Sequence, residues 1–231
     1  MNAHSVSRET LAALTSAQKL QITRVLAALE ADEHAPTAIR ERGQASQAHI
    51  ADSLAALELN ALSGARRIAD LGSGAGFPGL ALAVALPEAE VSLIESQRRK
   101  CEFLERLCAA AGVENARVVC ARAEEWGAGR SANDVVVARA LAPQTVVLEY
   151  AAPLLRTGGR LIDWRGKRDE SAEREADRAA ALLGLARDEL RRVSPFEGAS
   201  DRHLHVFTKV RETPQRFPRR AGIARKRPLG S

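Results

Sequence analysis

The residues whose chemistry is easiest to interpret lie in one glycine-rich loop, Asp70-Leu-Gly-Ser-Gly-Ala-Gly-Phe-Pro-Gly79. Its glycines leave the backbone free to adopt unusual dihedral angles and to lie against a ligand. The last three of them match G-x-G-x-x-G, a dinucleotide-binding pattern when it follows a strand and opens a helix. Glu95 is expected at the end of the next strand, where a carboxylate can accept two hydrogen bonds from a ribose diol. Together these features predict an adenosine-containing cofactor and leave NAD and S-adenosylmethionine open.

The position of Asp70, two residues before Gly72, favours S-adenosylmethionine. A nearby carboxylate disfavours a pyrophosphate, but it does not disfavour a cationic amino acid and a sulfonium. The D-x-G-x-G-x-G pattern resembles motif I of class I methyltransferases, in which the acid lies near the methionine ammonium of the cofactor. The same resemblance implies that Ala123 and Glu124, after the third expected strand, contact the adenine. No group of residues suited to hydride transfer accompanies the loop.

The elements that must position this loop follow from residue 66 onward, where short apolar runs alternate with helical stretches. Alternation of strand and helix predicts an α/β fold with a mostly parallel sheet that is covered on both faces. The last two apolar runs have no clear helix between them, so we expect them to form an antiparallel hairpin at the sheet edge. The expected strands are 67–71, 91–94, 117–120, 135–138, 160–164, 191–194 and 204–209, and the expected helices are 79–86, 97–111, 144–155 and 169–185.

Two amphipathic helical stretches precede this pattern, at about 8–31 and 47–59. We therefore divide the chain into three parts. Residues 1–64 form an N-terminal helical extension packed on the core, residues 65–210 form the cofactor-binding α/β domain, and residues 211–231 form a basic tail that we expect to be flexible.

The net charge of +5 is unevenly distributed. Residues 209–231 contain eight basic residues and one acid, a local charge of +7, so the remaining 208 residues carry −2. Such a tail is typical of contact with a polyanion such as nucleic acid, although a solvated tail has the same composition. No apolar run approaches the length of a bilayer span. The three cysteines are too few and too scattered for a disulfide framework or a zinc site, so we expect a cytoplasmic protein without a metal.

Further motifs occur along the chain. They are the F-P-G ending of the loop, Ala138-Arg-Ala140, His49-Ile-Ala-Asp-Ser-Leu54, Arg165-Gly-Lys167, Arg202-His-Leu204 and the ending Arg216-Phe-Pro-Arg-Arg-Ala-Gly222 with Lys226-Arg-Pro-Leu229. Together they resemble one family, bacterial small-subunit (16S) ribosomal RNA methyltransferase G, also called glucose-inhibited division protein B. The resemblance spans roughly residues 10–229. It implies a class I fold with S-adenosylmethionine as cofactor. It also implies methyl transfer to N7 of one guanine in 16S rRNA, with the rRNA or the small ribosomal subunit as partner. We expect a monomer and no membrane contact.

The resemblance, carried over by motif, implies the site residues. One residue, Arg139, is placed at the methyl-transfer end and is the expected catalytic residue. Glu95 is added from the ribose argument. The expected cofactor-binding residues are Asp70, Gly72, Gly74, Phe77, Glu95, Ala123, Glu124 and Arg139, and the expected rRNA contacts are Arg165, Lys167, Arg219 and Arg220.

Arg139 has two possible roles. Its guanidinium can pair with the cofactor carboxylate or donate to guanine O6 beside N7, or it can form a salt bridge that closes the cleft. His49, Asp52 and Ser53 likewise fit either substrate positioning or packing. The stretch 30–39 lacks the tryptophan and asparagines of a W-N-x-x-x-N-L-T-like segment found in many family members, and Arg165 replaces their usual lysine.

The chemistry agrees with N7 as the target. Guanine N7 has an in-plane lone pair and no proton, so transfer needs alignment rather than a general base. The chain has no N-P-P-Y or D-P-P-Y stretch for exocyclic amines and no Pro-Cys pair for attack on pyrimidines. Two other hypotheses stay open at this point: an NAD-dependent oxidoreductase and a non-catalytic RNA-binding protein.

Overall fold

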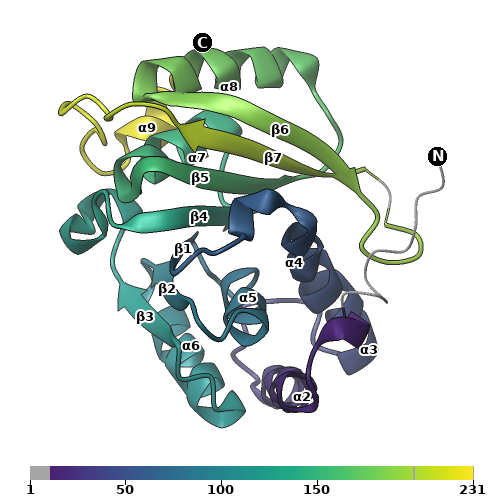
Figure 1. Cartoon of the computed structure of the whole chain (residues 1–231). Helices are drawn as coiled ribbons and strands as arrows, with labels where there is room; N and C mark the ends of the chain where they lie inside the picture. Colours follow the sequence, from purple (N-terminus) through teal and green to yellow (C-terminus); the bar gives the residue numbers. More distant parts are fainter. Residues whose placement is uncertain (1–10, 200, 231) are drawn as a thin grey trace.

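The computed structural model describes residues 11–199 and 201–230 and is built around a sheet of seven strands (Figure 1). The strands are β1 (Arg67–Leu71), β2 (Glu90–Glu95), β3 (Ala116–Cys120), β4 (Asn133–Arg139), β5 (Leu155–Arg165), β6 (Leu185–Val193) and β7 (Arg202–Lys209). They lie in the order β3-β2-β1-β4-β5-β7-β6. Strands β1 to β5 are parallel, whereas β7 runs antiparallel between β5 and β6. The expected mostly parallel sheet with an antiparallel edge hairpin is therefore confirmed.

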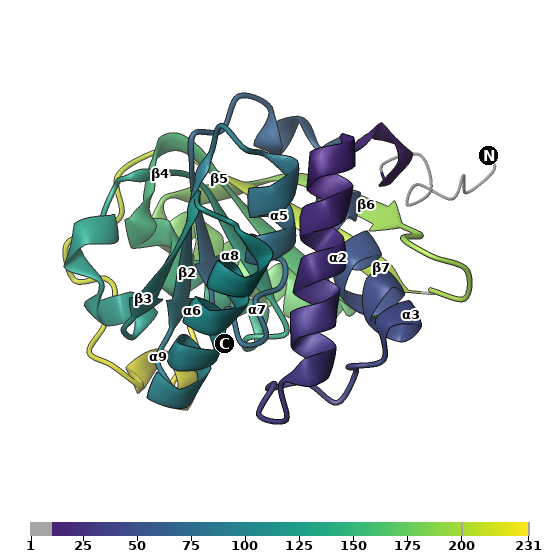
Figure 2. The same ribbon diagram turned by 90° about the horizontal axis from the view of Figure 1, so that it is seen from below.

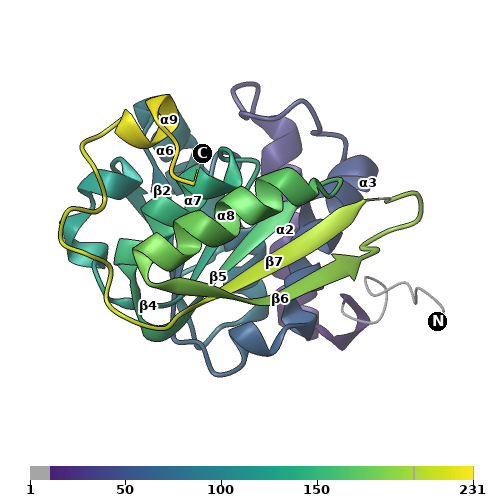
Figure 3. The ribbon, with the colours of Figure 1, turned by 90° about the horizontal axis from the view of Figure 1, so that it is seen from above.

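Helices cover both faces of this sheet. One face carries α2, α4, α5 and α6, as seen from below, and the other carries α7 and α8, as seen from above (Figures 2 and 3). No helix in the described ranges is long and apolar enough to cross a membrane. The helices are α2 (Ser16–Ala31), α3 (Arg42–Ala45), α4 (Asp52–Leu54), α5 (Gly79–Ala85), α6 (Arg98–Ala111), α7 (Gln144–Ala151), α8 (Glu170–Leu183) and α9 (Ile223–Lys226).

Local sequence sets the helix boundaries. Thr15 and Gln18 form a reciprocal capping box at the start of α2, and Asp169 accepts hydrogen bonds from two amides at the start of α8. Helices α6 and α8 each end at a glycine in the left-handed conformation, Gly112 and Gly184. The expected helix at 8–31 corresponds in its described part to α2 with a short helical stretch before it, and residues 1–10 lie outside the described residues.

The expected helix at 47–59 is not one regular helix. It runs from α3 through a π-helical turn, Ser46–Ala51, into α4 and a 3₁₀ turn. Wide turns of this kind are rare and occur often beside functional sites. Here the π-helical turn carries His49, whose side chain lines a cavity at the carboxyl ends of the parallel strands.

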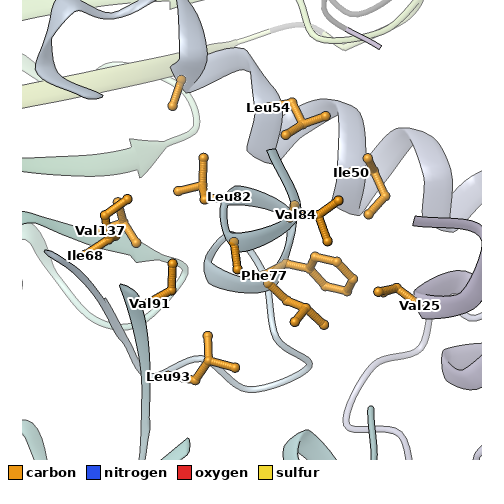
Figure 4. Close-up of a cluster of buried hydrophobic side chains, with 14 of the residues drawn as sticks. Val25, Ile50, Leu54, Ile68, Phe77, Leu82, Val84, Val91, Leu93 and Val137 are labelled. Carbon is orange, nitrogen blue, oxygen red and sulfur yellow. The ribbon is translucent and has the colours of Figure 1, made fainter. Parts of the chain in front are cut away.

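The N-terminal helices share a hydrophobic core with the sheet rather than packing separately. In this core, Val25 of α2 and Ile50 of the π-helical turn lie beside Phe77 of the glycine loop and Leu93 of β2 (Figure 4). All four side chains are buried. The glycine loop is consequently held from below by the sheet and from the side by the N-terminal segment.

The basic segment, which we expected to be flexible, is packed against the body in this structure. Residues 211–230 pack on the body beside α7 (Figure 3), with Phe217 and Ala224 buried in the core on that face. The backbone amide and guanidinium of Arg219 donate to the buried carboxylate of Glu149 on α7. Charge and proline content indicated a solvated tail, but two apolar anchors and one buried ion pair hold it in place.

Candidate functional site

A cavity of about 580 Å³ lies at the carboxyl ends of the parallel strands. This is the edge at which open α/β sheets bind ligands, and the volume suits a small molecule. Seven of the expected cofactor-binding residues line it, and Asp70 is the one that does not. Its lining residues include Thr37, His49, Gly72, Gly74, Phe77, Glu95, Lys100, Arg122, Ala123, Glu124, Arg139, Leu141, Tyr150 and Arg225.

The glycine loop is closely packed against the end of β2. The amides of Gly72 and Ser73 both donate to the carbonyl of Ile94, at 2.8 and 3.0 Å. Gly72 has a φ of +67°, and a Cβ atom there would lie 2.5 Å from Leu141. The positive φ therefore favours glycine at this position, and any larger residue would also have to displace the Leu141 methyl group.

Glu95 holds the loop in position and also faces the cavity. Its Oε1 accepts from the amides of Ser96 and Gln97, and its Oε2 accepts from the amide of Gly74 at 3.2 Å. An ionised carboxylate has about four acceptor positions. One position on Oε2 therefore stays available to a ligand hydroxyl, fewer than the two that a diol would use.

Asp70 lies beneath the glycine loop rather than in the cavity lining. Its Oδ2 accepts from the amide of Gly79, the first residue of α5, at 3.1 Å. A Cβ on Gly79 would lie 2.7 Å from Asp70, so glycine permits this close approach. The expected position of Asp70 near the methionine ammonium of the cofactor stays a prediction. Burial raises the pKa of its carboxyl to about 6, although the Gly79 amide acts in the opposite direction.

We expect Asp70→Asn to remove a pH-dependent cost of folding. The folded pKa of about 6 exceeds the ordinary 3.8, so the folded state binds the proton more tightly. Asp70 therefore favours folding at pH 4 and loses this contribution as pH rises through 6. Between pH 4 and 7 the free energy of unfolding of the variant should rise relative to wild type, by on the order of 2–3 kcal/mol. Urea unfolding of both proteins across this range measures the difference, and a constant difference would contradict it.

One end of the cavity is formed by Ala123 and Glu124 after β3, together with Tyr150 of α7 and Arg225 of α9. Oε1 of Glu124 accepts from the amide of Gly222 at 3.2 Å. Burial raises the pKa of the Tyr150 phenol, and the nearby Glu124 acts in the same direction. This end therefore combines a carboxylate, a phenol and a guanidinium from three separate parts of the chain.

The other end is formed by Arg139, at the carboxyl end of β4. Its Nη1 donates to Oδ2 of Asp52 at 2.8 Å and to the carbonyl of Ala48 at 3.1 Å, and its Nη2 lies 3.3 Å from Nδ1 of His49. The Arg139 side chain is 17% exposed and that of Asp52 is 6% exposed. The structure thus shows the salt bridge that was one expected role of Arg139, while its guanidinium also lines the cavity.

His49 completes this end as a neutral ring. It stacks on Phe77 with ring centroids 4.8 Å apart and 6° between planes. Burial lowers the pKa of His49, and the adjacent Arg139 lowers it further. Because Nδ1 faces the Arg139 donor, the proton belongs on Nε2, which lies 3.2 Å from the carbonyl of Ile39. The ring also lies 3.2 Å from the hydroxyl of Thr37.

The four expected rRNA contacts fall into two pairs. Arg165 donates to the buried carboxylate of Asp163, and Arg219 donates to Glu149, so both guanidinium groups are engaged within the protein. Lys167 and Arg220 are exposed. All four stay predictions as rRNA contacts, and the geometry favours the second pair because its side chains are exposed.

The cavity also contains residues that the sequence did not single out. They come from segments far apart in the chain, and only the sequence departure at 30–39 drew attention to one of them, Thr37. No cluster of metal-ligating side chains occurs among residues 11–199 and 201–230. The added lining residues include Thr37, Lys100, Arg122, Tyr150 and Arg225.

Comparison with known proteins gives a consistent result. The family described as GidB, rRNA small subunit methyltransferase G, matches residues 18–204. The Ribosomal RNA small subunit methyltransferase G of Syntrophomonas wolfei is 42% identical over 185 residues, which cover 78% of this chain and 85% of that protein. The protein of the same name from Rubrobacter xylanophilus is 41% identical over 187 residues, covering 78% and 72%.

A solved structure supports the fold. The 1,6-didemethyltoxoflavin-N1-methyltransferase of Burkholderia thailandensis, with 1,6-didemethyltoxoflavin and S-adenosylhomocysteine bound, matches with a TM-score of 0.53 at 17% identity. The match covers 71% of this chain and 80% of that chain. At this identity the likeness concerns the fold alone, and it confirms the expected methyltransferase-like sheet.

Proposed function

The chain belongs to the rRNA small subunit methyltransferase G family, and from that premise we propose that it transfers a methyl group from S-adenosylmethionine to N7 of a guanine in 16S rRNA. The observation that supports this most directly is the cavity at the carboxyl ends of the strands. It has Glu95 and Glu124 toward one side and Arg139 with His49 toward the other. Polar groups are thus available for a nucleoside and, separately, for a reacting base.

The residues present fit S-adenosylmethionine. Glu95 offers one free acceptor position for a ribose hydroxyl, and Glu124 offers an acceptor beside Ala123 for an adenine amine. Gly72 and Gly74 have no side chains, so the backbone of the glycine loop itself faces the cavity there. The buried Oδ1 of Asp70 has no hydrogen-bond partner in the described part of the chain. Its negative charge beneath the loop complements a cationic cofactor rather than the pyrophosphate of NAD.

When bound, S-adenosylmethionine supplies an electrophilic methyl carbon on a sulfonium. Guanine N7 carries a lone pair and no proton, so the protein has no proton to remove from it. The task of the chain is to align the base with the methyl group and to exclude water. Phe77, His49 and Arg139 form a closely packed wall for this purpose.

Arg139 has donors left for a ligand. The bonds to Asp52, Ala48 and His49 use three of its five N–H groups within the described chain. The remaining two can donate to the cofactor carboxylate or to guanine O6. Asp52 therefore fixes the guanidinium in place, and Arg139 is the residue that touches ligand.

We place the rRNA backbone over Lys167 and Arg220. Lys167 follows β5 at the carboxyl edge of the sheet, and Arg220 lies two residues before Gly222, which contacts Glu124 of the cavity. Both side chains are exposed. We further propose that the protein acts as a monomer in the cytoplasm, with residues 1–64 and 211–231 serving as additions to a 65–210 catalytic domain.

The rRNA surface predicts a change in salt dependence. Replacing both Lys167 and Arg220 by alanine should weaken 16S rRNA binding. It should also lower the slope of log affinity against log salt by about 2, since each phosphate contact contributes roughly 1. Filter binding between 50 and 200 mM salt measures the slope. Arg66→Ala, at the amino end of the sheet, is the matched control and should leave the slope unchanged. An unchanged slope in the double variant would place the phosphate contacts elsewhere.

The direct test of function uses tritiated S-adenosylmethionine with 16S rRNA or small ribosomal subunits that lack the modification. We expect label in the rRNA and a single cleavage site after borohydride and aniline treatment, which reports N7-methylguanine. Absence of a unique site would refute N7 transfer. Calorimetry should show binding of S-adenosylmethionine and of its demethylated product, and NAD should not bind.

A further inference from the structure

The C-terminal strap, residues 211–230, contributes to the cavity as well as packing on the body. It is fixed at Arg219, whose amide and guanidinium donate to Glu149, and at Phe217, which is buried. Beyond these anchors Gly222 donates to Glu124, a residue of the cavity wall. The strap thus passes directly over the end of the cavity that carries Ala123 and Glu124.

Arg225 is the strap residue that enters the cavity lining. Its guanidinium donates to the carbonyl of Leu141 at 3.2 Å, which ties α9 to the segment after β4. A hydrogen bond from Arg225 to Tyr150 acts to lower the pKa of that phenol, against the larger effect of burial. Arg225 is therefore held by two groups of the cavity wall, although its side chain stays exposed at the rim.

We propose that Arg225 and the strap form part of the adenosine-binding site, with the guanidinium recognising the adenine ring. Adenine has an electron-rich face and ring nitrogens that accept hydrogen bonds. A guanidinium can stack on the face or donate to the nitrogens, which an ammonium does less well. Glu124 supplies the complementary acceptor for the adenine amine. The inference rests on the proposed function for the identity of the cofactor.

The positions of the neighbouring cations distinguish recognition of adenine by Arg225 from a non-specific electrostatic attraction of RNA by the strap. Like Arg225, Lys226 and Arg227 are exposed, but they do not line the cavity. They carry the same charge on the same short helix or directly after it. If the strap acted only through charge, all three would contribute alike. The geometry instead assigns Arg225 to the cofactor and leaves the other two for the polyanion.

The test compares Arg225→Ala with Lys226→Ala in the full-length protein. Calorimetry with S-adenosylhomocysteine and with adenosine should show affinity for both ligands reduced about fivefold in Arg225→Ala, as for loss of a partly desolvated cation–π contact. Lys226→Ala should remain within twofold of wild type. In wild type, amide hydrogen exchange of residues 219–227 should slow when S-adenosylhomocysteine is added. Thermal unfolding of both variants checks that each is folded.

Each other outcome has a definite meaning. Equal losses in the two variants would indicate attraction by charge alone and overturn the inference, as would unchanged affinity in Arg225→Ala. A loss for S-adenosylhomocysteine without one for adenosine would place Arg225 at the amino-acid end and also overturn it. Failure of the wild-type protein to bind S-adenosylhomocysteine at all would instead refute the proposed cofactor.

Discussion

Arg139→Ala should lower methyl transfer to 16S rRNA by at least about 100-fold. The residue supplies fixed hydrogen-bond donors at the reacting end of the cavity, and removal of one such donor commonly costs this much in rate. Single-turnover transfer from tritiated S-adenosylmethionine measures the effect. The substitution also leaves Asp52 buried without its partner at 2.8 Å, so a loss of folding must be distinguished from a loss of chemistry.

Asp52→Asn provides that distinction. It removes the charge that Arg139 pairs with but keeps an amide oxygen that can accept the same hydrogen bond, and it retains the guanidinium. If Arg139 acts on ligand, Asp52→Asn should keep transfer within about tenfold of wild type. The double variant Arg139→Ala with Asp52→Asn should fold more stably than Arg139→Ala alone but transfer no faster. If instead Asp52→Asn were as inactive as Arg139→Ala, the pair would act as a structural link and the catalytic role of Arg139 would be wrong.

The parts of the fold that sequence predicted well are those in which local chemistry is sufficient. Expected strand 135–138 lies within β4, because buried parallel strands are continuous apolar runs between polar residues. Strand β6 was placed at 191–194 but spans Leu185–Val193. It is an edge strand with polar residues along most of its length, so no apolar run marks it. Its pairing with β7 defines it instead, and that pairing is a non-local property.

The same difference between local sequence and non-local contacts explains which site residues could be predicted. The glycine loop, Glu95 and Arg139 stand at strand ends, and the rule that parallel strands present ligands at one edge brings them together from sequence alone. The motif predicted Asp70 near the cofactor, but it did not predict that the carboxylate also accepts from the amide of Gly79 beneath the loop. Tyr150 and Arg225 could not be predicted, because their place depends on how the strap folds back over α7.

The strap itself depends on one buried charge pair, and this gives the largest expected effect on stability. Glu149 is fully buried, and its carboxylate accepts from the amide of Arg219 at 3.0 Å and from Nε at 2.8 Å. Arg219→Ala would leave that carboxylate without its countercharge in a water-excluded site. Loss of one partner of such a pair costs about 3–5 kcal/mol. Chemical unfolding should show a decrease of this size in the free energy of unfolding.

Two controls connect this decrease to the pair. Arg220→Ala removes an equal charge from the adjacent exposed position, and it should change stability by less than about 0.5 kcal/mol, as for ordinary surface substitutions. Combining Arg219→Ala with Glu149→Gln replaces the buried carboxylate by a neutral amide whose oxygen can still accept from the backbone of residue 219. That double variant should recover at least half of the lost stability. If Arg219→Ala were within 1 kcal/mol of wild type, the strap would not be anchored through Glu149 in solution. The basic segment would then be the flexible tail that its composition indicates, and Arg225 would have no fixed place over the cavity.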